Sequence, residues 1–304
     1  MSTLTDLADA VSSVASIVGP SIVGVGRNGR GSGIVFADGQ VLTNAHNLRG
    51  AEVTITFADG RSTRAAVTGV DPDGDLAVVN VDTAGATPIV WGTGDGEGAG
   101  LAIGAPVFGA AATGAGTLRV TFGLVSSVSR AFRGPGGRRI AGSVEHTAPL
   151  APGSSGGALV DADGRLVGLN TNRIGEGFYL ALPADAALKT RVDALARGES
   201  AERPRLGVAI APNHVARRLR RSVGLPDRAG ILVRGVEDDS PALAAGIEAG
   251  DLIVSAGGRP IADADDLHDA LSALEHPFEL GIVRGAEDRT VTVGDAKART
   301  PGDA

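Results

Sequence analysis

The chain has 304 residues, enough for about two domains, and 43% of them are hydrophobic, which is enough for packed cores. Its formal net charge of −7 argues against a nucleic-acid partner, because such proteins usually present a basic face. It contains no cysteine, so disulfides, thiolate metal sites and cysteine nucleophiles are excluded.

Residues 1–19 are predicted to form an amphipathic helix, ended by Pro20. Apolar residues recur at helical spacing: Leu4, Leu7, Val11, Val14 and Val18. The segment has no Lys or Arg and so lacks the basic start of a signal peptide. No apolar stretch of the chain approaches the roughly 20 residues that a membrane span needs. From the residues alone we expect no membrane span and a cytoplasmic protein.

The region after this helix has the pattern of short strands joined by glycine turns. The tetrapeptide Ala-Asp-Gly-polar separates apolar runs three times, at Ala37–Gln40, Ala58–Arg61 and Ala162–Arg165. Asp-Gly at such places predicts tight hairpins in which both central residues have positive φ. Residues 53–57 alternate between apolar residues and threonine, as a half-buried strand does. Together these patterns indicate a β-sandwich or barrel rather than a doubly wound sheet.

Asp185–Arg197 is predicted to be a helix that Asp185 caps and Gly198 ends. Residues 199–204 are polar, contain proline and form a predicted linker. The residues beyond it alternate between strand-like and helical patterns, which indicates a separate α+β module. Strand-like runs occupy Leu206–Ile210, Gly230–Val233, Leu252–Ser255, Glu279–Val283 and Thr290–Val293, and helical stretches lie near Pro241–Ala245 and Asp263–Leu274.

Two adjacent serines among glycines, in APGSSGGALV (residues 151–160), raise the question of a nucleophile. GSSGG, with Ser155 at its centre, matches the G-x-S-x-G pattern of α/β-hydrolases, in which a helix follows the serine. Here ALVDADGRLVGLN follows and predicts a hairpin instead. The other arrangement, on a β-barrel, has His, Asp and Ser in that order along the chain. His46 and Asp75 stand at strand ends upstream of the serine and fit that order.

Three segments resemble the signature segments of the HtrA family of trypsin-like serine proteases. They are GSGIVFADGQVLTNAH, VDPDGDLAVVNV and APGSSGGALVDADGRLVGLNT. Further along, SPALAAGIEAGDLIVSAGGRPIADADDLHDAL is similar to that family's PDZ domain. The resemblance implies a mainly β fold. It places a chymotrypsin/trypsin-like double β-barrel at residues 20–198, an α+β PDZ domain at 205–297 and a flexible tail at 298–304.

The resemblance places the family's catalytic base at His46, its acid at Asp75 and its nucleophile at Ser155. A serine hydroxyl is a poor nucleophile until a base takes its proton, and the acid holds the His in the required tautomer. The N–H groups of Gly153 and Ser155 would face the developing oxyanion. No metal or other cofactor is implied.

Three neighbouring residues depart from the family's usual pattern: Asn47 stands where Val is common, Ser154 where Asn is common and Ala158 where Pro is common. None of them supplies the triad. The stretch DPDGDL also mimics the start of a calcium loop, but that loop requires Gly where Leu76 stands, so it is excluded. The other upstream histidine, His146, has no matching family role and is predicted to be a strand residue near the cleft.

The resemblance places the primary substrate pocket at Gly168, Leu169, Asn170 and Thr171, with a following wall at Gly177–Leu182. No Asp is placed there to attract a basic side chain. A small or apolar residue before the cleaved bond is therefore expected.

In the PDZ domain, the resemblance implies capture of a peptide's C-terminal strand at a sheet edge, with the carboxylate in a backbone nest. The loop and strand for this are Leu206, Gly207, Val208, Ala209 and Ile210. A run with four arginines, HVARRLRRSVGLP (residues 214–226), is predicted to be a solvated helix face. The alternative is docking to an acidic partner or to the chain's own protease domain.

Two functions remain open. The first is a serine endopeptidase for unfolded or damaged proteins that captures protein C-termini through its PDZ domain. The second is a binding or chaperone-like module with weak hydrolysis, and the complete triad favours the first. The resemblance leaves a homo-oligomer open, although the N-terminal segment lacks the aromatic residues that pack the family's trimers. It also makes the cell envelope the alternative to the cytoplasm.

Overall fold

The computed structural model describes residues 3–27, 29–92, 101–113, 116–134, 139–175, 177–200, 206–211, 213–274 and 277–294. The chain divides into two units, residues 1–201 and residues 202–304, each with its own apolar core. Residues 201–204 of the predicted linker and the whole predicted tail lie outside the described residues. No helix in the described ranges has the length and apolarity needed to cross a membrane.

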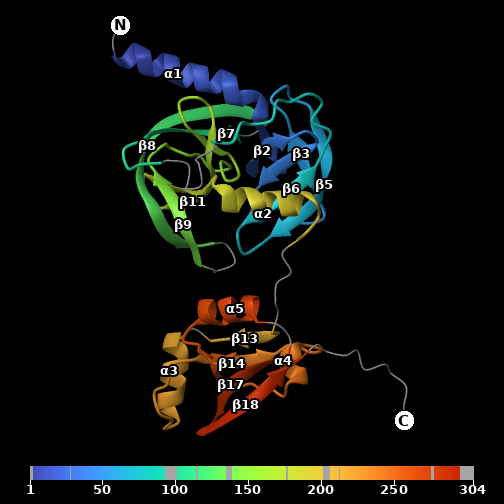
Figure 1. The fold of residues 1–304 in the computed structure, drawn as a ribbon, viewed down its shortest axis with the longest axis vertical. Coiled ribbons are helices and arrows are strands. Elements are labelled where there is room, and N and C mark those ends of the chain that lie inside the picture. Colours follow the sequence, from blue (N-terminus) through green and yellow to red (C-terminus); the bar gives the residue numbers. More distant parts are fainter. Residues whose placement is uncertain are drawn as a thin grey trace, which may run out of the picture. The chain divides into compact units, whose positions relative to one another are not determined.

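The first unit contains two closed antiparallel β-barrels (Figure 1), as the sequence predicts. The first barrel has the strand order β1-β2-β3-β6-β5-β4, with β1 Ile22–Val25, β2 Gly31–Ala37, β3 Gln40–Thr43, β4 Glu52–Thr56, β5 Ser62–Asp71 and β6 Leu76–Asn80. The second has the order β10-β11-β12-β9-β8-β7, with β7 Pro106–Thr113, β8 Thr117–Arg133, β9 Arg139–His146, β10 Ala158–Val160, β11 Leu166–Ile174 and β12 Phe178–Pro183.

The three predicted Asp-Gly turns join β2 to β3, β4 to β5 and β10 to β11. In each turn the glycine has positive φ, but the aspartate before it does not, so the expected turn type is wrong. In the last turn, the N–H of Gly164 donates to Asp161 O and the N–H of Asp161 donates to Arg165 O. A type I turn followed by a left-handed glycine has this pattern. The glycine alone supplies the left-handed residue that the hairpin needs.

Two helices pack on the barrels of this unit: α1, Thr3–Val18, which the 3₁₀ turn Gly19–Ser21 follows, and α2, Ala186–Ala196. Val14 and Val18 of α1 are buried in an apolar core that both barrels share, whereas Leu4 is 79% exposed. The predicted amphipathic helix therefore forms, but only the C-terminal part of its apolar stripe is buried.

Helix α2 closes over the first barrel although it follows the second barrel in the chain. Asp185 caps it as predicted, because its carboxylate accepts the N–H of Leu188 at 2.8 Å. Leu195 of α2 is buried, and its carbonyl lies so close to Gly69 of β5 that a Cβ there would clash with it. This close approach ties α2 to β5, and the turn that follows β5 carries part of the candidate site.

The second unit is an α+β module, as predicted, with the sheet order β13-β14-β15-β17-β18 and β16 paired to β15. Its strands are β13 Val208–Ile210, β14 Ile231–Val236, β15 Leu252–Ala256, β16 Arg259–Pro260, β17 Phe278–Arg284 and β18 Glu287–Val293. Its helices are α3 Asn213–Ser222, α4 Pro241–Ala244 and α5 Ala264–Ala273. Asp263 caps α5 through a capping box with Asp266, which explains why the helix begins there.

Candidate active site

His46 and Asp75 form a hydrogen-bonded pair in the first barrel. His46 lies in the 3₁₀ turn Ala45–Asn47 after β3, and Asp75 lies directly before β6. The Nδ1 atom of His46 is 2.8 Å from Asp75 Oδ2 and 2.9 Å from Oδ1, and the backbone N–H of His46 donates to Oδ1 at 3.1 Å. The Asp75 side chain is 2% exposed and the His46 side chain 29%. The pair thus has one buried anionic end and one end open to solvent.

The turn between β5 and β6 holds Asp75 in place. The carboxylate of Asp71 accepts the N–H groups of Asp73 and Gly74 at 3.1 and 2.8 Å, and Arg191 of α2 forms an ion pair with it. Asp75 itself has φ of 55°, an uncommon conformation for a residue other than glycine. Asn44 donates to its carbonyl at 2.9 Å. These hydrogen bonds stabilise a positive-φ backbone conformation at Asp75 that is otherwise unfavourable for aspartate.

Ser155 lies in the loop between β9 and β10. At two positions of this loop, only glycine fits. Gly153 and Gly156 have φ of 89° and 86°. A Cβ at Gly153 would clash with the carbonyl oxygen of Gly29, and one at Gly156 with that of Ser32. In this loop the Ser154 side chain is buried, whereas Ser155 is partly exposed. Of the two serines, Ser155 is the one that a substrate can reach.

Residues of the first barrel donate hydrogen bonds to the carbonyl groups of the Ser155 loop. Ser155 O accepts the backbone N–H of Ser32 at 2.8 Å and the Nδ2 of Asn47 at 2.9 Å, and Ser32 Oγ donates to Gly153 O at 2.8 Å. Sequence reasoning noted Asn47 only as a departure from the family. In the structure, Asn47 donates a hydrogen bond to the Ser155 carbonyl, which a valine at this position could not do.

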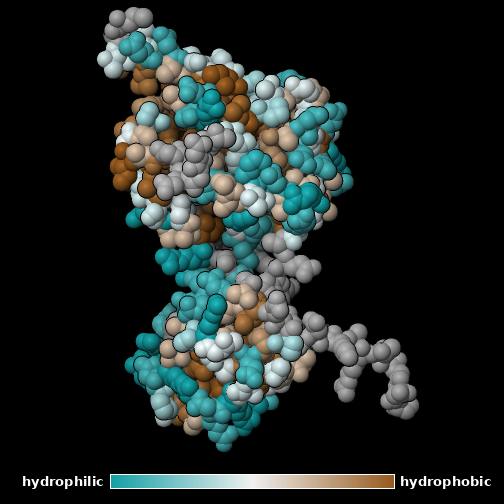
Figure 2. Space-filling model, in the orientation of Figure 1, coloured by the Kyte–Doolittle hydropathy of each residue, from teal (hydrophilic) through white to brown (hydrophobic). Residues whose placement is uncertain are grey.

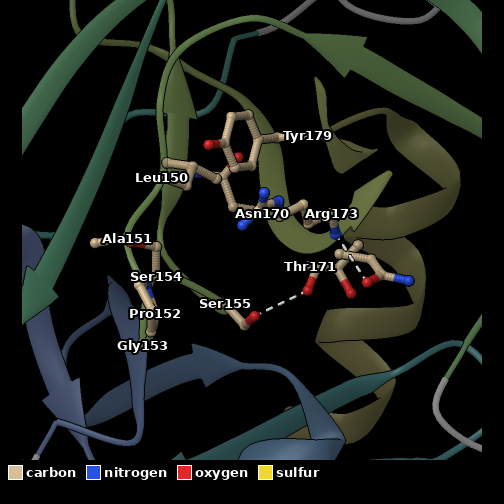
Figure 3. Close-up of a pocket in the computed structure, with 11 residues that line it drawn as sticks. Leu150, Ala151, Pro152, Gly153, Ser154, Ser155, Asn170, Thr171, Arg173 and Tyr179 are labelled. Atoms are coloured by element: carbon tan, nitrogen blue, oxygen red, sulfur yellow. Dashed lines mark hydrogen bonds between the residues drawn. The ribbon is translucent and has the colours of Figure 1, made fainter. Parts of the chain in front are cut away.

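Thr171 of β11 connects Ser155 to Asp75. Its hydroxyl donates to Asp75 Oδ2 at 2.7 Å, and its carbonyl accepts the Ser155 hydroxyl at 2.9 Å (Figure 3). Among the described residues, Ser155 Oγ has no hydrogen bond to His46. The structure therefore brings the three predicted triad residues to one junction, with the serine hydroxyl turned toward Thr171. Sequence reasoning placed Thr171 only in the substrate pocket.

The backbone N–H groups of Gly153 and Ser155 have no acceptor within the described part of the chain. Two neighbouring N–H groups are used: Ser154 donates to Ala151 O at 3.1 Å and Gly156 to Asn170 O at 2.7 Å. Both predicted oxyanion donors are thus left for an external acceptor.

A cavity of about 200 Å³ adjoins Ser155 in the second barrel. Asn170 and Thr171 line it, as predicted, but Gly168 and Leu169 lie outside it. The Leu169 side chain is fully buried in the core that both barrels share, and Gly168 packs against Ala181 and Leu182. The cavity walls that sequence reasoning missed include Leu150 and Arg173, whereas Tyr179, seen above Asn170 in Figure 3, lies within the predicted following wall Gly177–Leu182.

His146, at the end of β9, lies buried behind this cavity. Its Nε2 is 3.0 Å from Asn170 Oδ1, and its ring stacks on Tyr179 with 5.9 Å between centroids. Asn170 Nδ2 donates to Ala158 O, so Oδ1 faces the histidine and Nε2 carries the proton. Burial lowers the pKa of His146 from 6.5 to about 4, against the opposing effect of the Asn170 hydrogen bond. His146 is a neutral support for two cavity residues.

The predicted peptide-binding segment of the second unit lies at an end of its sheet. Within the described residues, β13 pairs with β14 only, which leaves its other edge open. The carbonyls of Leu206 and Gly207 accept the N–H groups of Ala242 and Glu237, while their own N–H groups have no acceptor among the described residues. The Leu206 side chain is buried in the core, and Ile210 is 39% exposed. The segment offers a free edge and free donors, whereas the Leu206 side chain serves the core.

The four arginines at residues 214–226 lie on α3, where the surface is largely hydrophilic (Figure 2). Arg217, Arg218 and Arg221 are exposed, as expected for a solvated face. Arg220 is buried, and its Nε donates to Pro226 O at 3.3 Å. The expectation is therefore wrong for Arg220, which anchors the end of α3 to the chain that follows.

Comparison with known proteins matches each unit to a family. The trypsin-like peptidase domain family matches residues 31–169, and the PDZ domain family matches residues 204–294. The putative serine protease HhoA of Synechocystis is 35% identical over 294 residues, which cover 90% of this chain and 72% of HhoA.

Another relative is a probable periplasmic serine endoprotease, DegP-like, of Halomonas elongata. It is 32% identical over 283 residues, which cover 88% of this chain but only 57% of the relative. The chain thus spans little more than half the length of this DegP-like protein. The solved structure of the HtrA-type protease AlgW with a decapeptide has a TM-score of 0.68 at 24% identity, over 93% of this chain and 97% of AlgW. That likeness shows the fold.

Proposed function

Because this chain belongs to the HtrA family of trypsin-like serine proteases, we propose that it is a serine endopeptidase whose triad is His46, Asp75 and Ser155. One observation carries the proposal. The buried Asp75 carboxylate holds His46 at the junction of the barrels, where the partly exposed Ser155 lies in a glycine-dependent loop. Labelling of Ser155 by a fluorophosphonate, together with hydrolysis of casein, tests it.

In the proposed reaction, Ser155 Oγ attacks the carbonyl carbon of the peptide bond while its proton passes to Nε2 of His46. Before this attack, the hydrogen bond from the Ser155 hydroxyl to the Thr171 carbonyl must break, which requires only a rotation about the Cα–Cβ bond of Ser155. The Asp75 carboxylate accepts a hydrogen bond from Nδ1–H of His46, and this tautomer leaves Nε2 unprotonated as the base. The imidazolium that forms, stabilised by Asp75, then gives its proton to the leaving amine.

The N–H groups of Gly153 and Ser155 stabilise the oxyanion of the tetrahedral intermediate. A donor of this kind is typically worth about 3–4 kcal/mol of transition-state stabilisation. Holding the donors still matters as much as having them, because a preorganised donor costs no reorganisation during the reaction. The contacts of Ser32 and Asn47 with the loop carbonyls supply this rigidity.

We further propose unfolded or damaged polypeptides as the substrates, with their C-termini bound along β13. The open edge of β13 and the free N–H groups of Leu206 and Gly207 support this, since β-strand addition uses such an edge. Relatives whose names include "periplasmic" favour the cell-envelope alternative over the cytoplasmic expectation, so we propose the envelope as the place of action.

The second candidate function is a binding module that keeps the protease fold and hydrolyses weakly. The observation that favours it is the bond of 2.9 Å from Ser155 Oγ to Thr171 O, which holds the serine proton away from His46. If that bond persists with substrate bound, the serine is not activated. Labelling by a fluorophosphonate separates the two candidates, because only an activated serine reacts.

The PDZ domain is expected to bind free C-termini. A peptide with an apolar C-terminal residue should bind full-length Ser155→Ala at least about tenfold more tightly than its amidated form, since amidation removes the charge-assisted bonds to the Leu206 and Gly207 N–H groups. Fluorescence anisotropy with labelled peptides measures the difference. Equal affinity for both forms would disprove carboxylate capture, and an internal copy of the same sequence provides the control.

Ending the chain after Gly198 is expected to preserve cleavage of short peptides and to slow digestion of unfolded casein by about tenfold. All triad positions lie in the first unit, which has its own core, and the proposed capture strand lies in the second. The ratio of the two rates, compared with that of the full chain, is the measurement. A folded truncated protein with no peptidase activity would show that the second unit completes the active site.

A further inference from the structure

A second cavity, larger than the one beside Tyr179, lies in the first barrel and is lined by arginines. Its volume is about 510 Å³, and its walls include Arg27, Arg30, Arg49 and Arg64. Such a gathering stands out in a chain whose formal net charge is −7. We call the cavity with these four residues the arginine groove.

Most of the positive charge of the groove is not neutralised. Arg64 pairs with Glu52, which also lines the groove, at 3.2 Å. Within the described ranges, Arg27, Arg30 and Arg49 have no carboxylate partner, and all three are exposed. The groove therefore presents three cationic guanidinium groups to whatever enters it.

The arginine groove lies next to the loop of Ser155. Asn47, which lines the groove, donates its Nδ2 to the Ser155 carbonyl at 2.9 Å. Gly29, between two groove arginines in the chain, has its carbonyl in close approach to Gly153. The cavity with Asn170 and Tyr179 borders the same loop from the second barrel. Each barrel thus has a cavity next to the Ser155 loop.

We propose that the arginine groove binds acidic side chains of the polypeptide substrate on the leaving-group side of the cleaved bond. The inference rests on the proposed endopeptidase function. If the residue before the cleaved bond fills the cavity in the second barrel, the chain beyond Ser155 continues toward Asn47 and the groove. Arginine suits this task because its planar fork of donors matches a carboxylate, and it stays charged at every working pH.

The exposure of the arginines sets the size and the salt dependence of the effect. Ion pairs open to water contribute modestly, and salt screens them over about 8–10 Å near physiological ionic strength. Several pairs together should give a preference for acidic over neutral substrates of about five- to tenfold at low salt, and less than about twofold at 0.5 M salt. A neutral polar groove would show neither the preference nor the salt dependence.

The test uses the full-length protein and two fluorogenic peptides that differ only in the second to fourth residues after the cleaved bond, which are Glu in one and Gln in the other. The ratio of kcat/KM for the Glu and Gln peptides should be about five- to tenfold in the wild type at low salt. In Arg27→Gln/Arg30→Gln/Arg49→Gln it should fall to about one, because the cations are gone. Each ratio is taken within one variant, so differences in folded fraction cancel.

The matched control is Arg119→Gln/Arg165→Gln/Arg218→Gln, which changes the net charge equally at exposed arginines outside the groove. It should keep the wild-type ratio. A ratio near one in the wild type, or an equal loss in the control, would overturn the proposal, the latter because overall charge would then explain the preference.

Binding to full-length Ser155→Ala gives a readout that does not require hydrolysis. The Glu peptide should bind more tightly than the Gln peptide, and the groove substitutions should abolish the difference. If no peptide is cleaved but this difference remains, the endopeptidase function fails while the groove stands as a site for acidic peptides. A short single-stranded DNA of equal charge that competes as well as the Glu peptide would overturn recognition of carboxylates in favour of a general polyanion site.

Discussion

Replacing Ser155 with alanine is expected to lower casein turnover by about 10⁴-fold or more and to abolish labelling by a fluorophosphonate. The reason is that Ser155 is the partly exposed serine of its loop, and its own N–H and that of Gly153 have no acceptor among the residues that the structure describes. Losses from His46→Ala and Asp75→Asn should not add to it, because the three residues act as one unit. Casein hydrolysis and in-gel fluorescence of the labelled protein measure the effect.

Ser154→Ala is the matched control for this experiment. Ser154 is buried, and its hydroxyl has no hydrogen-bond partner among the described residues, so its removal should leave labelling and hydrolysis close to the wild type. Labelling that survives in Ser155→Ala would refute the assignment of the nucleophile. A wild type that neither reacts nor hydrolyses casein under any activating peptide or temperature would favour the binding-module function.

The relation of sequence to fold is clear in the hairpins. The Asp-Gly pairs correctly marked where strands turn, because a left-handed residue is needed there and glycine adopts it without cost. They did not reveal the turn type. That depends on the register of the two strands, and at the turn after β10 the register shifts by a bulge that involves Leu159 and Val160. Pairing between strands is a tertiary property, which a four-residue pattern does not contain.

In the candidate site, too, local sequence segments predicted some features, whereas others depend on tertiary contacts. The positions of His46, Asp75 and Ser155 could be predicted because they stand in recognisable segments. The supports could not, since Asn47 and Thr171 act through atoms that reach across from other strands. In β11, the residues that line the cavity beside Ser155 begin at Asn170 and run to Arg173, where the register with β12 shifts, whereas Leu169 before them is buried in the core. The signature segment did not reveal that the predicted run was offset by two residues, because the register between strands is a tertiary property.

The second large expected effect concerns His146, whose burial should lower the free energy of unfolding in acid. Its pKa in the folded chain, lowered by burial to about 4, lies below the 6.5 of an unfolded histidine. As the pH falls from 6.5 toward 4, the unfolded chain binds a proton that the native chain does not, so the free energy of unfolding decreases. The slope approaches 1.4 kcal/mol per pH unit, which amounts to about 3 kcal/mol over this window.

His146→Gln is expected to remove this part of the acid sensitivity, because glutamine does not titrate and its amide can still donate to Asn170. Urea unfolding at pH 7 and pH 4.5, followed by Trp91 fluorescence, measures it, since Trp91 is the only tryptophan of the chain and lies in the first unit. The wild type should lose about 2–3 kcal/mol more than the variant between the two pH values. His214→Gln, at an exposed position of α3 in the other unit, controls for loss of a histidine and should keep the wild-type change. If His146→Gln loses as much stability as the wild type, His146 must accept its proton within the fold, and it would then be a cation beside Asn170 rather than its neutral support.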